Sequence, residues 1–192
     1  MKIINVLIVG VGGQGTLLAS RVLGKLAEMK GYACKLSEVH GMAQRGGSVV
    51  THVRMGDEVF SPIIAEGEAD FIIAFEELEG LRARHFLKKD GELLINRQQI
   101  MPMPVIIGVK TYPKDIVAKI KKEGINVLDM DALSIANECG NSRAVNTVML
   151  GLLLRRLCVD KESAKEIIKA VVPAKLLEVN LLAVEKGYDY YN

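Results

Sequence analysis

Tryptophan is absent from this sequence of 192 residues, and aromatic residues make up only 5% of it. The hydrophobic share is nevertheless 49%, so we expect a core built from Ile, Val, Leu and Ala. A chain of this length can bury a core of its own, and we interpret residues 1–192 as a single domain.

Long apolar runs are also missing. The longest covers residues 148–154, whereas a transmembrane helix needs about 18 apolar residues or more, which excludes a membrane span. Residues 1–10 contain one Lys, a short apolar stretch and then a glycine rather than a cleavage site, so they are typical of a strand and not of a signal peptide. We therefore expect a cytoplasmic protein.

Neither sign of charge dominates the sequence. The 25 basic residues are balanced by 23 acidic ones, which gives a formal net charge of +2 without basic clustering. Non-specific binding to nucleic acid depends on a strong positive field, so we expect no nucleic-acid partner.

Cysteine is scarce as well. The three cysteines, Cys34, Cys139 and Cys158, lie far apart and form no CxxC pair. Because an iron–sulfur cluster is usually held by four thiolates, the chain cannot build one by itself. We interpret the cysteines as reduced and mostly buried thiols, and we expect the chain to bind no metal.

The first part of the chain predicts a unit of strand, helix and strand. Residues 3–9 form a continuous aliphatic run that ends at Gly10, as expected of a strand buried on both faces of a parallel sheet. The apolar periodicity over 14–30 predicts a helix, and residues 32–39 predict the second strand.

Residues 48–61 interrupt this alternation. The alternating side chains of 48–55, followed by Gly56-Asp57, predict a β-hairpin whose second strand covers 58–61. His52 and Arg54 share one face of the first strand, and we interpret that face as solvated.

The rest of the chain returns to alternating elements and then becomes helical. Strands are predicted over 71–75, 92–96, 105–109 and 125–128, and helices over 76–87, 113–122, 132–138, 143–158, 161–172 and 173–186. The stretch 144–157 is apolar almost all round and should be the buried helix. The predicted fold class is α/β: a Rossmann-like, mostly parallel sheet with helices on both faces, an inserted β-hairpin and a C-terminal helical segment.

A glycine-rich turn joins the first strand to the first helix. Residues 10–15 read Gly-Val-Gly-Gly-Gln-Gly, which matches GxGxxG in the context where that pattern has meaning. Glycines let a ligand approach the main chain, while free N–H groups and the helix dipole attract a phosphate. We interpret the turn as an anion site; the alternative is a tight turn that only packs the helix on the sheet. Its candidate binding residues are Gly10, Gly12, Gly13, Gln14, Gly15 and Thr16.

A dinucleotide site would need one more feature. An acidic residue about 20 positions beyond the glycines should hold a ribose hydroxyl. Counting from Gly15 leads to Lys35, and the nearest carboxylate, Glu38, comes slightly late. Neither residue fits cleanly, so binding of NAD(P) stays an alternative.

The loop after the second predicted strand gathers a carboxylate, an imidazole, an amide and a guanidinium. In open α/β sheets ligands bind at the carboxyl ends of the strands, so this loop and the glycine turn should border one crevice. Arg45, flanked by glycines, could present its guanidinium to a phosphate or carboxylate. The alternative is an ion-pair network of Glu38, His40 and Arg45 that only orders the loop. The candidate binding residues are Glu38, His40, Gln44, Arg45, Gly46 and Gly47.

Taken together, the glycine turn and the stretch Glu-Val-His-Gly-Met-Ala-Gln-Arg-Gly-Gly over 38–47 resemble the gamma-type components of 2-oxoacid:ferredoxin oxidoreductases. The likeness covers the whole chain in length and element order, including Asn146 and Gly151 near its helical end. Within this family the loop over 40–47 is similar to that of the enzymes acting on aryl pyruvates such as indolepyruvate, since pyruvate-type components carry a different loop.

The resemblance implies a division of labour. In this family a 2-oxo acid is decarboxylated on thiamine diphosphate, electrons pass through iron–sulfur clusters to ferredoxin, and coenzyme A takes the acyl group. The resemblance implies that a partner alpha subunit holds the thiamine diphosphate, its Mg²⁺ and the clusters, and that this chain belongs to a hetero-oligomer. By analogy, the glycine turn and the Arg45 loop would help to receive coenzyme A.

The residues agree with this division. The chain has too few cysteines for a cluster and no Gly-Asp-Gly motif with a distant Asn for thiamine diphosphate; residues 56–58 come nearest. We assign no catalytic residue, and we interpret Asn146 as structural. Two alternatives stay open: a gamma subunit for pyruvate or another 2-oxo acid, and an independent NAD(P)-binding protein.

Overall fold

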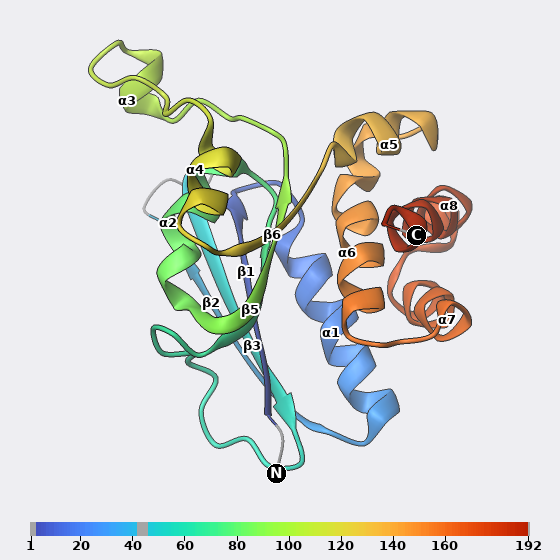
Figure 1. Ribbon diagram of the computed structural model, residues 1–192. Coiled ribbons are helices and arrows are strands. Elements are labelled where there is room, and N and C mark those ends of the chain that lie inside the picture. The colour runs from blue at the N-terminus through green and yellow to red at the C-terminus, as the bar shows by residue number, and fades with distance from the viewer. Residues whose placement is uncertain (1–2, 42–45, 192) are drawn as a thin grey trace.

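The computed structural model describes residues 3–41 and 46–191, in which a six-stranded sheet has the strand order β2-β3-β1-β4-β5-β6 (Figure 1). The strands are β1 (Ile3–Val11), β2 (Ala33–His40), β3 (Ser48–Gly56), β4 (Ala69–Ala74), β5 (Leu87–Asn96) and β6 (Asn126–Met130). Strands β1, β4, β5 and β6 run parallel, whereas β3 is antiparallel to both β1 and β2. The prediction of a mostly parallel sheet is confirmed.

Helices cover both faces of this sheet, as predicted. They are α1 (Thr16–Lys30), α2 (Glu77–Ala83), α3 (Met103–Ile106), α4 (Ile116–Lys122), α5 (Ala132–Glu138), α6 (Val145–Arg156), α7 (Lys161–Val171) and α8 (Leu177–Asp189). Helices α1 and α5 to α8 lie on one side of the sheet, and α2 and α4 lie on the other (Figure 1). No helix in the described ranges has both the length and the apolar character needed to cross a membrane.

Successive side chains of β1 point to opposite faces of the sheet and belong to two different hydrophobic clusters. Val6 and Ile8 pack in the cluster beneath α1 and α6, while Leu7 and Val9 pack in the cluster beneath α2 and α4. All four side chains are at most 1% exposed, which explains why an aliphatic residue stands at each of these positions.

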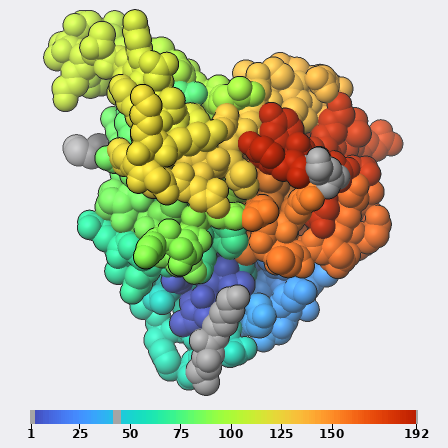
Figure 2. All heavy atoms as spheres, in the orientation of Figure 1, coloured from blue at the N-terminus to red at the C-terminus, as the bar shows by residue number. Residues whose placement is uncertain are grey.

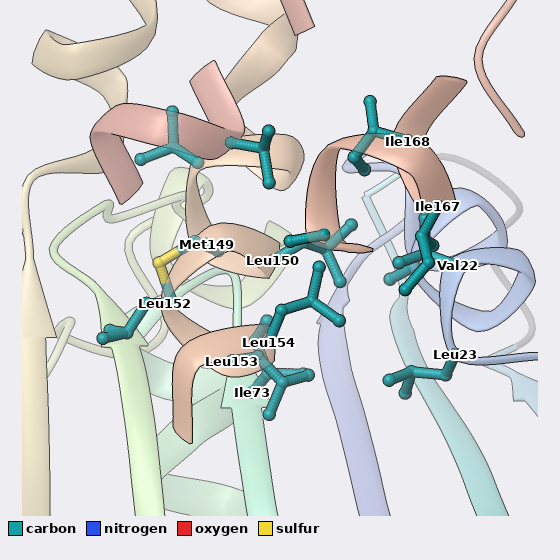
Figure 3. Packing of buried hydrophobic residues seen from close by; sticks show 14 of the residues in the cluster. Val22, Leu23, Ile73, Met149, Leu150, Leu152, Leu153, Leu154, Ile167 and Ile168 are labelled. Atoms are coloured by element: carbon teal, nitrogen blue, oxygen red, sulfur yellow. The ribbon is translucent and has the colours of Figure 1, made fainter. Parts of the chain in front are cut away.

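Helix α6 is the buried helix that the apolar stretch predicted. Its residues 146–154 are all buried, and Figure 3 shows Leu150 and Leu154 gathered with Val22 of α1 and Ile167 of α7. Its contact with α8 is so close that a Cβ atom on Gly187 would lie 1.9 Å from the carbonyl oxygen of Val148. The two helix backbones therefore touch at this glycine.

The predicted hairpin over 48–61 is wrong. Residues 58–61 form no strand, and β3 instead pairs antiparallel with β2, the strand that precedes it in the chain. Because β3 also pairs with β1, it lies between the two strands of the predicted βαβ unit. The alternating pattern gave the antiparallel strand correctly but carries no information on its partners.

The prediction that the face carrying His52 and Arg54 is solvated is wrong as well. His52 is only 7% exposed, and its Nδ1 accepts a hydrogen bond of 3.2 Å from the backbone N–H of Ile64. Arg54 is half-buried and donates to the side-chain oxygen of Asn5 over 2.9 Å. The segment 57–68, which was predicted to contain the returning strand, covers this face instead.

The predicted strand over 105–109 is also wrong. Helix α3 begins at Met103, and residues 101–111 stand away from the body of the molecule (Figures 1 and 2). Apolar composition is shared by buried strands and by exposed segments of this kind, so the pattern alone does not separate them. Strands β4, β5 and β6 confirm the neighbouring predictions, although β5 begins earlier, at Leu87.

Candidate functional site

The glycine turn leads from β1 into α1 through two residues with left-handed backbone. Gly13 has φ 102° and Gly15 has φ 87°, a region that disfavours any side chain. At the start of α1, Leu18 donates its N–H to the carbonyl oxygen of Gly15 over 3.0 Å, whereas the N–H groups of Thr16 and Leu17 donate to no carbonyl in the described ranges. Gly12 donates its N–H to the carbonyl oxygen of Gly47 over 2.9 Å. The two loops therefore adjoin, as predicted.

Gln14 holds this turn against the sheet. Its side-chain oxygen accepts from the N–H of Val11 over 2.8 Å, and its nitrogen donates to the carbonyl oxygen of Phe75 over 3.0 Å. The same nitrogen reaches Oε1 of Gln98 at 3.3 Å. A Cβ atom on Gly10 would lie 2.9 Å from the Gln14 oxygen, which accounts for the glycine there. The side-chain amide of Gln14 is thus already hydrogen-bonded within the protein and fixes the position of the turn.

Two cavities flank the turn, and Gly13 and Gly15 line both of them. Cavity A has a volume of about 360 Å³ and is lined by Gly13, Gln14, Gly15, Gln98, Leu133, Ser142, Arg143, Val145 and Asn146. Cavity B has a volume of about 520 Å³ and is lined by Gly12, Gly13, Gly15, Thr16, Leu17, Glu38, His40 and Val49. Cavity B is the predicted crevice between the glycine turn and the second loop.

A contact between a histidine and a carboxylate lines cavity B. His40 Nε2 lies 2.7 Å from Glu38 Oε1, and the hydroxyl of Thr51 donates to Glu38 Oε2 over 2.9 Å. Both oxygens of the Glu38 carboxylate are therefore engaged. Gln44 and Arg45 lie outside the described residues, so the interpretations that rest on them are not addressed by this geometry. Gly46 has φ 78° and stands where the chain turns back into β3.

Cavity A presents hydrogen-bond donors. Asn146 is only 7% exposed; its side-chain oxygen accepts from the N–H of Thr147 over 2.8 Å. Its Nδ2 lies against Gly15, where a Cβ atom would be 2.1 Å away, and donates no hydrogen bond within the described residues. The Arg143 guanidinium has no carboxylate partner in that same part of the chain. Together with the N–H groups at the start of α1, these donors suit an oxyanion.

Arg143 lines cavity A, although no motif in the sequence marks it as a candidate binding residue. It lies in the turn Ser142–Ala144 directly before α6, and its N–H is capped by the side chain of Asn141 over 3.0 Å. The sequence feature that could have identified it is the polar stretch 141–143, which directly precedes the most apolar helix, α6. The interpretation of Asn146 as structural accounts for its oxygen, whereas its nitrogen lies beside Gly15, which lines cavity A together with Asn146.

Below the turn, a buried carboxylate joins three segments. Glu76 is 1% exposed and caps α2 by accepting from the N–H of Glu79 over 2.9 Å. Its other oxygen accepts from the N–H of Ile100 over 3.1 Å and from the hydroxyl of Tyr112. Burial raises the pKa of Glu76, and burial together with the nearby Glu76 raises the pKa of Tyr112.

Asn96 secures the ends of three strands beneath the same turn. Its side-chain nitrogen donates to the carbonyl oxygen of Phe75 and to Oε1 of Gln98, both over 3.1 Å. Its oxygen accepts from the N–H of Ala132 over 3.1 Å. The residue is fully buried, so this network fixes Gln98 in the wall of cavity A.

Potential metal ligands are dispersed. Across residues 3–41 and 46–191, no group of three or more His, Cys, Asp or Glu side chains is arranged to hold a metal ion. The cysteines are free thiols: Cys139 is buried, Cys34 is half-buried and Cys158 is exposed. The expectation of mostly buried thiols is therefore wrong for Cys158.

Comparison with known proteins places this geometry in a family. The family model for pyruvate ferredoxin/flavodoxin oxidoreductase matches residues 5–190. Indolepyruvate oxidoreductase subunit IorB of Thermococcus kodakarensis is 42% identical over 97% of this chain and 95% of its own length. This near full-length match confirms the resemblance drawn from the two loops.

Solved structures agree on the fold. Pyruvate oxidoreductase subunit PORC from Thermotoga maritima has a TM-score of 0.72 at 26% identity, covering 98% of this chain and 97% of that one. The 2-oxoglutarate:ferredoxin oxidoreductase from Magnetococcus marinus has a TM-score of 0.74 at 19% identity, covering 98% of this chain but 31% of that one. This chain is an oxidoreductase subunit and belongs to the pyruvate ferredoxin/flavodoxin oxidoreductase family.

Proposed function

We propose that this chain is a subunit of an indolepyruvate:ferredoxin oxidoreductase, which converts an aryl pyruvate, coenzyme A and oxidised ferredoxin into aryl-acetyl-CoA, carbon dioxide and reduced ferredoxin. The observation that carries the proposal is the 42% identity over nearly the whole length of a subunit named for indolepyruvate. The pyruvate-named PORC is only 26% identical, so pyruvate is the less favoured substrate.

The catalytic cofactors belong, in this proposal, to a partner alpha subunit. Thiamine diphosphate with Mg²⁺ would stabilise the carbanion left by decarboxylation, and the iron–sulfur clusters would carry its electrons to ferredoxin. The proposal is supported by the scarcity of cysteine, since the three thiols of this sequence are fewer than the four that an iron–sulfur cluster usually needs. We place the assembled enzyme in the cytoplasm.

The role of this chain is to receive the anionic part of coenzyme A at the glycine turn. Phosphate groups need converging donors, and cavity A offers the Arg143 guanidinium, Nδ2 of Asn146 and the main-chain N–H groups of Gly13 and Gly15. The N–H of Gln14, between them, already donates to the carbonyl oxygen of Val11 over 3.1 Å. The residues present therefore fit a phosphate. Gln44, Arg45, Gly46 and Gly47 of the second loop would help to bind coenzyme A, as the family resemblance implies.

The candidate residues then divide by role. Gly10, Gly12, Gly13 and Gly15 let the main chain approach the ligand, and Gln14 positions the turn by its bonds to the ends of β1 and β4. The Glu38–His40 pair would form the wall of cavity B, and Thr16 would offer its N–H and hydroxyl.

An independent NAD(P)-binding protein is less well supported. The residue that holds the ribose in such sites ends the strand next to β1, but here β3 separates β1 from β2. Glu38, the nearest carboxylate, is already engaged by His40 and Thr51.

The test is anaerobic co-expression with the candidate alpha subunit. We expect the purified pair to reduce ferredoxin or a viologen dye only when both indolepyruvate and coenzyme A are supplied. The proposal is contradicted if the pair shows no such oxidation while the isolated chain binds NAD(P)H with micromolar affinity.

A further inference from the structure

Residues 101–111, here called the arm, stand clear of the molecule on the side of α2 and α4. No residue of the arm is buried, and the space-filling view shows it as a knob projecting from the rounded body (Figure 2). Its large apolar side chains are widely exposed: Met101 43%, Met103 65%, Ile106 65%, Ile107 63% and Val109 70%.

This exposure differs from ordinary surface hydrophobicity. Single apolar side chains are common on protein surfaces, whereas a contiguous group marks a contact surface. The sequence over 100–109 contains only apolar residues and glycine, so no polar side chain interrupts the apolar surface there. Covering these side chains would remove apolar surface from water, which favours association.

The arm is held in shape before it meets a partner. Lys110 donates its N–H to the carbonyl oxygen of Pro104 over 2.9 Å, which closes the arm on itself. At its base, the N–H of Ile100 and the hydroxyl of Tyr112 both meet the buried carboxylate of Glu76. A segment ordered in this way loses little conformational entropy on binding.

We propose that the arm inserts into an apolar groove of the alpha subunit, with acidic side chains at the rim of that groove. This inference rests on the proposed function, which supplies the alpha subunit. The acidic rim follows from Lys110, near the end of the arm, and Lys114, just beyond it, which have no carboxylate partner in the described part of this chain.

A second copy of the chain fits less well as the occupant. A stable interface uses about 20–30 residues from each side, so two arms alone would form a weak contact. A projecting arm needs a recess to enter, and cavities A and B are lined mainly by polar side chains and glycine backbone. The pocket between α5 and α8 is more apolar, but its carboxylates, Glu185 and Asp189, are already paired with Lys161 of the same chain.

The base of the arm also adjoins the candidate site. Gln98, which leads into the arm, lies in the wall of cavity A and contacts Nε2 of Gln14 at 3.3 Å. A subunit that grips the arm is therefore brought to the side of the glycine turn, where the proposed function requires the two subunits to meet.

The test measures how tightly the wild-type chain and its arm variants bind the alpha subunit. The double variant Ile106→Asp, Ile107→Asp is expected to raise the dissociation constant of the complex at least about tenfold. Phe60→Asp is the control, since Phe60 is 84% exposed but belongs to the segment 57–68 between β3 and β4 and not to the arm. That segment lies toward the end of the sheet away from α3 (Figure 1). The Phe60→Asp variant should assemble like the wild type.

Both variants should keep the melting temperature of the isolated wild-type chain, because the replaced side chains are exposed. If the double variant does not fold, Met103→Ser combined with Val109→Ser replaces it. The inference is overturned, and the proposed function kept, if arm variants bind the alpha subunit as tightly as the wild type. It is also overturned if the isolated chain dimerises and the double variant abolishes that dimer. Failure of the wild-type chain to bind the alpha subunit overturns both.

Discussion

Nδ2 of Asn146 occupies the space that a Cβ atom on Gly15 would need, at a distance of only 2.1 Å. The glycine turn and the buried helix α6 are therefore fitted to one another at a single point. This contact joins the start of α1 to the start of α6 and brings the amide donor of Asn146 to the edge of cavity A.

Replacing Gly15 should be costly for two separable reasons. Gly15→Ala combines a left-handed backbone, φ 87°, with the clash against Asn146, and should lower the free energy of unfolding by about 2–4 kcal/mol. In an Asn146→Ala background the clash disappears but the backbone strain remains, so the loss should shrink by about 1 kcal/mol or more. Urea denaturation of the four proteins measures this coupling, and additive losses would contradict it.

Arg143→Gln should weaken the use of coenzyme A by the assembled enzyme. Losing a charge-assisted contact to a phosphate costs about 1.5–3 kcal/mol, so the KM for coenzyme A should rise roughly tenfold or more. The KM for indolepyruvate should not change. Arg45→Ala is expected to raise the KM for coenzyme A as well. Arg21→Gln, on the exposed side of α1, is the control. If neither Arg143→Gln nor Arg45→Ala changes the KM for coenzyme A, the glycine turn only packs α1 on the sheet.

Glu76 predicts a pH dependence of stability. Burial raises its pKa above the ordinary value of 4.5, so the folded chain keeps a proton that the unfolded chain has already released. The stabilising contribution is full below pH 4.5 and is lost as the pH rises toward the raised pKa. Glu76→Gln should flatten this decline in the free energy of unfolding, whereas Glu28→Gln, at an exposed position, should leave it in place. An equal decline in both variants would refute the assignment.

Two glycine-to-alanine changes should act in opposite directions. Gly187→Ala places a Cβ atom 1.9 Å from the Val148 carbonyl and must push α8 away from α6, so a loss of about 3 kcal/mol or more is expected. Gly24→Ala, within α1, meets nothing within 4 Å and should stabilise the chain by about 0.5–1 kcal/mol. Thermal unfolding distinguishes the two, and a mild effect of Gly187→Ala would show that the helices can separate freely.

Much of the fold could be predicted from the sequence because burial imposes a period. The aliphatic run of β1 and the apolar helix α6 follow directly from being enclosed on all sides. The pairing of β3 with both β1 and β2 could not be predicted, because side-chain alternation specifies a face and not a neighbour. The arm was mistaken for a strand because composition does not say whether an apolar segment is buried within its own chain.

The candidate site was predicted in outline. The glycine pattern and the carboxyl end of the sheet led to cavity B with Glu38 and His40. Arg143 comes from a turn more than a hundred residues further along the chain and is brought to the glycine turn only by the packing of α6. A local sequence pattern therefore cannot predict that Arg143 lies beside the glycine turn.

The most direct test of the account is reconstitution. The purified chain is added stepwise, under anaerobic conditions, to the alpha subunit, and coenzyme A-dependent reduction of viologen by indolepyruvate is measured at each step. The account predicts negligible activity without this chain and a rise that saturates at a fixed ratio of the two subunits. Full activity of the alpha subunit alone, with no response to the added chain, would contradict it.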